Sequence, residues 1–154
     1  MTAGRVTLRA PEAGDASVLI AGRDEEFRRW LGPGTSDPDP TACILVDGEV
    51  VGWVDFDAQR PWLEPGAVNI GYSVFAGHRG RGVAASAVRL LIDWLAAETA
   101  HVSATFLIDA ENFASQRVAL AVGAQEIARW YENGREQIHY AVKISRFRGT
   151  TVRN

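Results

Sequence analysis

The segment His78–Ala84, which reads His-Arg-Gly-Arg-Gly-Val-Ala, constrains the fold more than any other part of the chain. It follows a short alternating apolar run and precedes a long amphipathic stretch. A strand, a loop of glycine and arginine, and a helix N-terminus together favour phosphate binding. Glycine lets the backbone come close, and the first helical N–H groups lack partners within the helix. The segment therefore predicts an α/β protein whose loop holds an anionic group.

Length and charge narrow the class of protein. A chain of 154 residues can bury about 68–70% of its unfolded surface in one core. We therefore expect a single domain spanning 1–154. The formal net charge of −3 argues against a general nucleic-acid partner, because such binding depends on many cations. Three arginines near the end of the chain, Arg146, Arg148 and Arg153, are expected to form a solvated basic tail.

Cysteine and histidine usage predicts neither a disulfide nor a metal site. Cys43 is the one cysteine in the sequence and lies in an apolar strand pattern, which predicts buried packing. His78, His101 and His139 show no spacing typical of metal ligands. Residues 1–10 lack the apolar core of a signal peptide, and no apolar run is long enough to cross a membrane. We therefore expect a soluble, cytoplasmic protein with no membrane partner.

Apolar periodicity predicts the order β-α-α-β-β-β-α-β-α-β-β. The pair Asp47-Gly48 between two apolar runs is a strong hairpin signal. This order favours a mixed sheet with helices on both faces. The expected strands are 6–9, 41–46, 49–56, 67–74, 102–108, 125–130 and 137–144, and the expected helices are 11–22 (opened by Pro11), 24–31, 82–99 and 112–122.

Helical and strand spacing also predicts which side chains form the core. The expected inward residues are Val83, Ala87, Leu90, Leu91, Trp94 and Leu95 in helix 82–99, and Ala114, Val118, Ala121 and Val122 in helix 112–122. In the last strand, Ile138, Tyr140, Val142 and Ile144 share one face. His139 falls on the other face and is expected to be solvated.

Two motifs give the chain a resemblance to a known family. Residues 79–84, Arg-Gly-Arg-Gly-Val-Ala, fit the signature Gln/Arg-x-x-Gly-x-Gly/Ala of the GNAT superfamily of N-acetyltransferases. Residues 111–115, Glu-Asn-Phe-Ala-Ser, followed by Val-Gly-Ala at 122–124, resemble the Asn-x-x-Ser…Gly-Phe/Ala segment of its branch that acetylates ribosomal-protein N-termini. Residues 24–31 and 69–72 are also similar to that branch, so the resemblance covers nearly the whole chain.

The resemblance implies a fold and a cosubstrate. The fold is a mixed, mostly antiparallel sheet of six to seven strands, splayed between strands 4 and 5, with acetyl-coenzyme A in the gap. The pantetheine arm of the cosubstrate would pair with the backbone of strand four. Its pyrophosphate would lie on the glycine loop, with Arg79 and Arg81 as charge partners. Asn112 and Ser115 would line the far side of the pantetheine arm. The implied cofactor-binding residues are Val74, Phe75, Arg79, Gly80, Arg81, Gly82, Val83, Ala84, Asn112 and Ser115.

Other interpretations of these residues stay open. The loop can be a simple turn with Arg81 as a surface charge, and Asn112 and Ser115 can cap a helix without touching a cofactor. Trp30 and Trp62 flank the expected loops and are candidates for an acceptor pocket or for packing.

The family's activity implies direct attack of an amine on the thioester in a ternary complex. A backbone N–H near Val74 would hold the oxyanion. Ser115 and Tyr131 are the hydroxyl candidates for protonating the thiolate. The branch often has glutamate where this chain has Asn69, which cannot act as a base. Three carboxylates are possible substitutes: Asp55, Asp57 and Glu111.

The missing glutamate favours an acceptor amine of low pKa. An α-amine with a pKa near 8 costs about 1.4 kcal/mol to deprotonate at pH 7, whereas a lysine side chain costs about 4.6 kcal/mol. The acceptor is therefore expected to be a peptide N-terminus or a small-molecule amine. The enzyme itself is expected to be a monomer or a homodimer. An acyl-CoA-binding module without catalysis is the alternative that Asn69 keeps open. A nucleotide-binding regulator is disfavoured because neither GxxxxGK[ST] nor GxGxxG is present.

Overall fold

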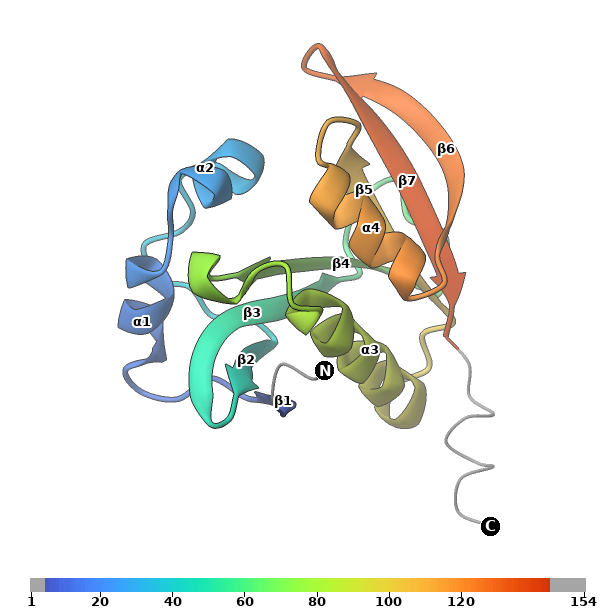
Figure 1. Ribbon diagram of the computed structural model, residues 1–154. Helices are drawn as coiled ribbons and strands as arrows, with labels where there is room; N and C mark the ends of the chain where they lie inside the picture. The colour runs from blue at the N-terminus through green and yellow to red at the C-terminus, as the bar shows by residue number, and fades with distance from the viewer. Residues whose placement is uncertain (1–4, 145–154) are drawn as a thin grey trace. The chain divides into compact units, whose positions relative to one another are not determined.

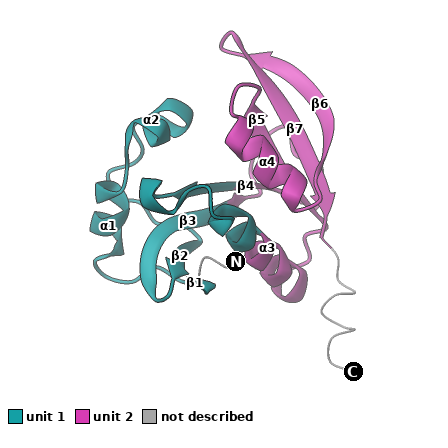
Figure 2. Ribbon diagram, viewed as in Figure 1, with its two compact units in different colours: residues 1–55, 71–88 teal, residues 56–70, 89–154 magenta. Residues whose placement is uncertain are grey.

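The computed structural model describes residues 5–144, so the three C-terminal arginines lie outside the described residues. The chain divides into two compact units (Figure 2). The first unit comprises residues 1–55 and 71–88, and the second comprises residues 56–70 and 89–154.

The order of elements confirms the expected one and adds a short 3-10 helix, η1 (Figure 1). The strands are β1 (Val6–Arg9), β2 (Ala42–Val46), β3 (Glu49–Asp57), β4 (Ala67–Val74), β5 (Ser103–Asp109), β6 (Gln125–Glu132) and β7 (Arg135–Lys143). The helices are α1 (Asp15–Ala21), α2 (Glu25–Leu31), η1 (Ala76–His78), α3 (Val83–Glu98) and α4 (Phe113–Ala121).

The seven strands form one hydrogen-bonded series in the order β1-β2-β3-β4-β5-β7-β6. The pairs β1–β2, β2–β3, β5–β7 and β6–β7 are antiparallel, whereas β4 and β5 are parallel. The β4–β5 ladder runs only from the pair Ala67–Ser103 to the pair Asn69–Thr105, although β4 continues to Val74. This topology confirms the predicted mixed, mostly antiparallel sheet of six to seven strands.

The first unit is organised around the hairpin of β2 and β3. Asp47 and Gly48 both have positive φ, 49° and 86°, which is the geometry of a two-residue hairpin turn. Cys43 is fully buried, as predicted, and packs with Leu19 and Leu45. Phe75 lies against the same cluster.

The first helix begins later than the sequence predicts. Pro11 does not open it, because α1 starts at Asp15 after Gly14 with φ 93°. The Asp15 carboxylate accepts hydrogen bonds from the Glu12 N–H at 2.6 Å and from Arg9 at 2.6 Å. These bonds hold residues 11–14 in a turn rather than in the helix.

The predicted buried stripes of α3 and α4 are confirmed in part: Val83, Ala87, Leu91 and Leu95 of α3 are buried, and Val118 and Val122 of α4 are half-buried. Leu90 and Trp94 of α3 are 37% and 46% exposed. The buried stripe instead lies toward Val88 and Ile92 and comprises Val83, Ala87, Val88, Leu91, Ile92 and Leu95. In α4 the buried residue is Ala119, whereas Ala114 and Ala121 are exposed. The alanine positions were wrong because alanine is small enough to occupy either face. Trp94 is exposed because it lies at the edge of the stripe beside Phe56, with ring centroids 6.2 Å apart.

The second unit contains the hairpin of β6 and β7, which turns at Asn133 and Gly134, with φ 53° and 77°. Ile138 and Tyr140 of β7 are buried, Val142 is half-buried, and Ile144, just after the strand, is buried, as predicted for one face of this segment. The prediction for His139 is wrong, since only 7% of its surface is exposed. The opposite face of β7 is covered there by the rings of Trp62 and Trp130, which sequence periodicity alone does not indicate.

Candidate cofactor-binding and catalytic site

The loop between η1 and α3 has an open backbone. Gly80 and Gly82 have φ of 75° and 78°, a left-handed conformation that glycine adopts at little cost. Beyond their chain neighbours, no described heavy atom lies within 4 Å of a Cβ built on either glycine. The first α3 hydrogen bond runs from the Ser86 N–H to the Gly82 carbonyl, so the preceding N–H groups have no acceptor one turn back. This arrangement suits a phosphate group.

The first residue of the motif, Arg79, forms an ion pair within the first unit. Its Nη1 and Nη2 donate to the two carboxylate oxygens of Asp24 at 2.8 and 3.0 Å, and its Nε donates to the Val74 carbonyl at 2.8 Å. The bonds from Arg79, with one from the Phe27 N–H, lower the pKa of Asp24 to about 2. Hydrogen bonding to Asp24 also raises the pKa of Arg79. Arg79 is thus held by protein groups on two sides.

The backbone at the end of β4 is fixed in place. The Phe75 N–H donates to the Val51 carbonyl at 2.8 Å, and the Phe75 carbonyl accepts from His78 at 2.9 Å. The Phe75 ring leaves no room for a Cβ on Gly22, whose ideal position is 2.3 Å from the ring. Because successive N–H groups of a strand point to opposite edges, the Val74 N–H points away from β3.

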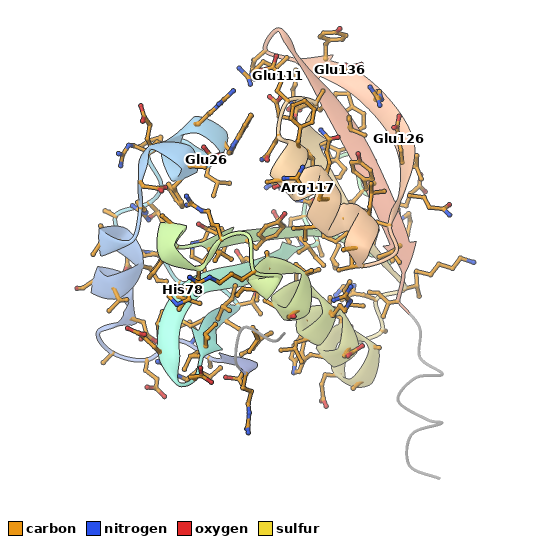
Figure 3. The ribbon with its side chains drawn as sticks, viewed as in Figure 1. Glu26, His78, Glu111, Arg117, Glu126 and Glu136 are labelled. Atoms are coloured by element: carbon orange, nitrogen blue, oxygen red, sulfur yellow. The ribbon has the colours of Figure 1, made fainter. Side chains whose placement is uncertain are left out.

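The other motif residues of the first unit differ in their exposure to solvent. Arg81, Gly80 and Gly82 are exposed, whereas Val83 is buried at the start of α3 and Ala84 is half-buried. His78 ends η1 just before the loop (Figure 3). Arg81 is the exposed cation of the glycine loop.

In the second unit, Asn112 and Ser115 are brought together at the start of α4. The Asn112 side chain accepts a hydrogen bond from the Ser115 N–H at 3.2 Å, which makes Asn112 the helix cap. Gln116 fixes the preceding turn by donating to the Ala110 carbonyl at 2.9 Å. The capping interpretation of Asn112 is therefore confirmed, while its contact with a cofactor stays a prediction. Glu111 and Arg117 flank this cap on the chain (Figure 3).

The two remaining catalytic candidates have different surroundings. The Asn69 side-chain oxygen lies 3.4 Å from the hydroxyl of Thr105, which also donates to the Val68 carbonyl at 3.0 Å. Tyr131 lies in β6 near the hairpin turn and is 72% exposed. Asn69 therefore stands at the last β4–β5 pair, and the Tyr131 side chain is open to solvent.

The three carboxylates proposed as substitute bases are engaged to different degrees. Asp55 accepts from the N–H and the hydroxyl of Thr41 at 3.0 and 2.6 Å. The Gln59 N–H and the Arg60 guanidinium lower the pKa of Asp57. Glu111 lies 3.7 Å from Arg135, and 69% of its side chain is exposed. Among residues 5–144, no cluster of three metal-ligating side chains is present, and no helix there is long and apolar enough to span a membrane.

A family model for the acetyltransferase (GNAT) domain matches residues 5–125. The chain belongs to the GNAT family. No curated protein sequence matches it. Among solved structures, it is similar to a GNAT-family acetyltransferase from Bacillus anthracis, with a TM-score of 0.78 and 15% identity over 94% of this chain and 98% of that one.

Two further GNAT structures hold a coenzyme A species. Mycobacterium smegmatis RimJ in complex with CoA-disulfide has a TM-score of 0.76 and 20% identity, covering 91% of this chain and 82% of that one. The aminoglycoside acetyltransferase AAC(6')-Ib in complex with coenzyme A has a TM-score of 0.77 and 17% identity, covering 96% and 99%. At these identities the likeness shows the shared GNAT fold.

Sequence reasoning missed one residue that bears on the GNAT signature, Asp24. Its position before Phe27 is a recognisable helix-capping signal, and its side chain does accept from the Phe27 N–H at 3.0 Å. Its pairing with Arg79, 55 residues later, has no local sequence signal. The structure thus adds a partner to the first residue of the motif.

Proposed function

We propose that this GNAT protein transfers an acetyl group from acetyl-coenzyme A to a primary amine by direct attack in a ternary complex. The observation that carries the proposal is the loop at Gly80–Gly82, whose left-handed glycines leave the backbone open at the N-terminus of α3. The coenzyme A species in the RimJ and AAC(6')-Ib structures support the choice of cosubstrate.

The proposed donor-binding groups are mainly backbone. The N–H groups of residues 80–84 would bind the pyrophosphate, with the exposed Arg81 as charge partner. The backbone at Val74 and Phe75 would adjoin the pantetheine arm. In the second unit, Asn112 and Ser115 are proposed contacts on the strength of the family motif alone.

The chemistry requires four events. The neutral amine nitrogen attacks the thioester carbonyl carbon, and the carbonyl oxygen becomes an oxyanion that the Val74 N–H is proposed to stabilise. Collapse of that intermediate breaks the carbon–sulfur bond. The leaving thiolate takes a proton from the hydroxyl of Ser115 or Tyr131. The acylated nitrogen loses its extra proton to water or to a carboxylate, and the hydroxyl group regains a proton from solvent. Positioning of the reactants can supply about 7–11 kcal/mol of the rate enhancement.

The acceptor is proposed to be an amine of low pKa. Asn69 cannot act as a base, and the hydrogen bonds of Asp55 and Asp57 serve protein groups. Without a strong base, an α-amine is favoured over a lysine side chain because more of it is neutral at pH 7. A peptide N-terminus or a small-molecule amine meets this requirement.

The decisive experiment pairs a binding measurement with a turnover measurement. Calorimetry with coenzyme A tests the donor site, and thiol release from acetyl-CoA across a panel of α-amines, lysine side chains and aminoglycosides tests catalysis. We expect binding, with turnover fastest for α-amines. Binding without thiol release would support the alternative that Asn69 keeps open, a non-catalytic acyl-CoA-binding module. Absence of binding would overturn both.

A further inference from the structure

Arg79 is the first residue of the glycine loop, but its guanidinium group donates three hydrogen bonds to other protein groups. Two go to the carboxylate of Asp24 and one goes to the carbonyl of Val74. The side chains of Arg79 and Asp24 are each about one third exposed, at 33% and 34%. A fork of this kind fixes both the distance and the orientation of its partners.

Asp24 holds two structural elements at once. Its Oδ1 accepts from the Phe27 N–H at 3.0 Å, which caps α2, and from Arg79 at 3.0 Å. Arg79 in turn bonds to the last residue of β4, Val74. The pair therefore connects the start of α2, the end of β4 and the beginning of the glycine loop, all within the first unit.

Two nearby carboxylates, of Asp24 and Glu26, offset the positive charge of Arg79. Asp24 is ionised across the physiological range, since its pKa lies near 2. Glu26, on the first turn of α2, adds a second negative charge that acts on Arg79 (Figure 3). A cation beside two carboxylates attracts a pyrophosphate weakly. Arg81, exposed between the two glycines, carries its charge directly on the loop.

We infer that Arg79 and Asp24 are positioning residues of the donor loop, and that Arg81 is the side chain that supplies positive charge to the bound pyrophosphate. The inference rests on the proposed function, because it takes coenzyme A as the ligand of this loop. It assigns to Asp24 a role that the motif does not include: the carboxylate holds the loop in its binding conformation through Arg79.

The test is a double-mutant cycle on coenzyme A affinity, measured by calorimetry. Asp24→Asn keeps an oxygen that caps α2 but loses the charge, and Arg79→Met keeps an unbranched stem of similar length to the aliphatic part of arginine but loses all donors. We expect each single variant to raise the Kd about fivefold, and the double variant to raise it no further. Glu126→Gln is the matched control, because it breaks an ion pair with Arg129 at 2.6 Å in the second unit, and its Kd should stay unchanged.

Opposite outcomes identify the competing role. If Arg79 binds pyrophosphate directly, Asp24→Asn frees it and coenzyme A binds as tightly as before or more tightly, while Arg79→Met still weakens binding. That result would overturn the inference, as would additive effects in the double variant. If the parent protein itself does not bind coenzyme A, the proposed function fails instead.

A measurement without ligand tests the positioning role of Arg79 and Asp24 independently of the affinity for coenzyme A. Hydrogen exchange of the amides of residues 79–82 reports the loop conformation directly. Both single variants should exchange several-fold faster there than the parent protein, with the β6–β7 hairpin unchanged. Equal exchange at the loop in all variants would mean that the ion pair does not position it.

Discussion

The imidazole of His139 lies edge-on to the indole of Trp62, with ring centroids 4.9 Å apart and planes at 81°. Trp130 flanks it on another side at 5.4 Å. The Nε2 atom is buried and has no hydrogen-bond partner among the described residues. Burial lowers the pKa of His139, because the charged imidazolium is poorly solvated there.

Trp62→Ala should raise the pKa of His139 toward its ordinary value of 6.5, since the change admits water to the ring. The pKa of His139 is lower in the folded state than in the unfolded state. The free energy of unfolding should therefore be constant with respect to this group above pH 6.5 and should decrease as the pH falls from 6.5 toward the folded-state pKa. The parent protein should therefore lose stability over that window, and the variant should lose less. A proton NMR titration and urea unfolding at several pH values measure both effects. Trp94→Ala, whose ring lies beside Phe56, is the control and should leave the His139 titration unchanged.

Gly52→Ala should destabilise the first unit. A Cβ at this position would lie 2.1 Å from the backbone oxygen of Ser73 and 3.0 Å from the Cα of Val74. Since backbone atoms cannot move aside as a side-chain tip can, we expect a cost of about 1–3 kcal/mol in the free energy of unfolding. Gly77→Ala meets no described atom within 4 Å beyond its chain neighbours and should stay within about 0.5 kcal/mol of the parent. Equal stability of the two variants would contradict the close approach of β3 and β4.

The sequence predicted features that depend on neighbouring residues. The turn at Asp47-Gly48 and the cap at Asn112 are local, because backbone geometry and side-chain reach act within a few residues. The loop at Gly80 and Gly82, expected from its glycines, also depends on local residues, and the structure adds that both glycines have positive φ. Each of these could be read from residue type and spacing.

Features that depend on distant segments could not be predicted in this way. Arg79 meets Asp24 across 55 residues, so the motif alone suggested only a charge partner for the pyrophosphate. His139 follows the alternation of a polar face, yet Trp62 from the β3–β4 connection covers it. Exposure of Trp94 and Leu90 likewise depends on which neighbours the helix meets. In each instance tertiary contacts decided what local pattern left open.

Asp15→Asn should remove an acid-sensitive part of the stability. The Asp15 carboxylate accepts from Arg9, from the Glu12 N–H and from the Cys43 thiol, and these bonds, Arg9 first, lower its pKa to about 2. A lowered carboxyl pKa stabilises the fold above the unfolded value near 3.8, and this stability is lost as the pH falls from there toward 2. We expect the variant to be less stable by about 1–3 kcal/mol at neutral pH, with a shallower acid transition in urea unfolding. Asp39→Asn, at an exposed loop position, is the control and should stay within about 0.5 kcal/mol of the parent at neutral pH.

Substitution of the loop glycines shows whether the loop requires a left-handed backbone conformation or open space beside the backbone. Gly82→Ala and Gly80→Ala each place a Cβ on a residue with φ near +75° to +78°, which costs about 1–2 kcal/mol of stability. If phosphate oxygens bind this backbone, the Kd for coenzyme A should also rise about tenfold as charge-assisted N–H bonds lengthen. Gly82→Asn tolerates the left-handed conformation better but still carries a Cβ, so it should recover stability and not affinity. Gly77→Ala should change neither quantity. Recovery of both stability and affinity in Gly82→Asn would mean that the loop needs the conformation and not the open approach.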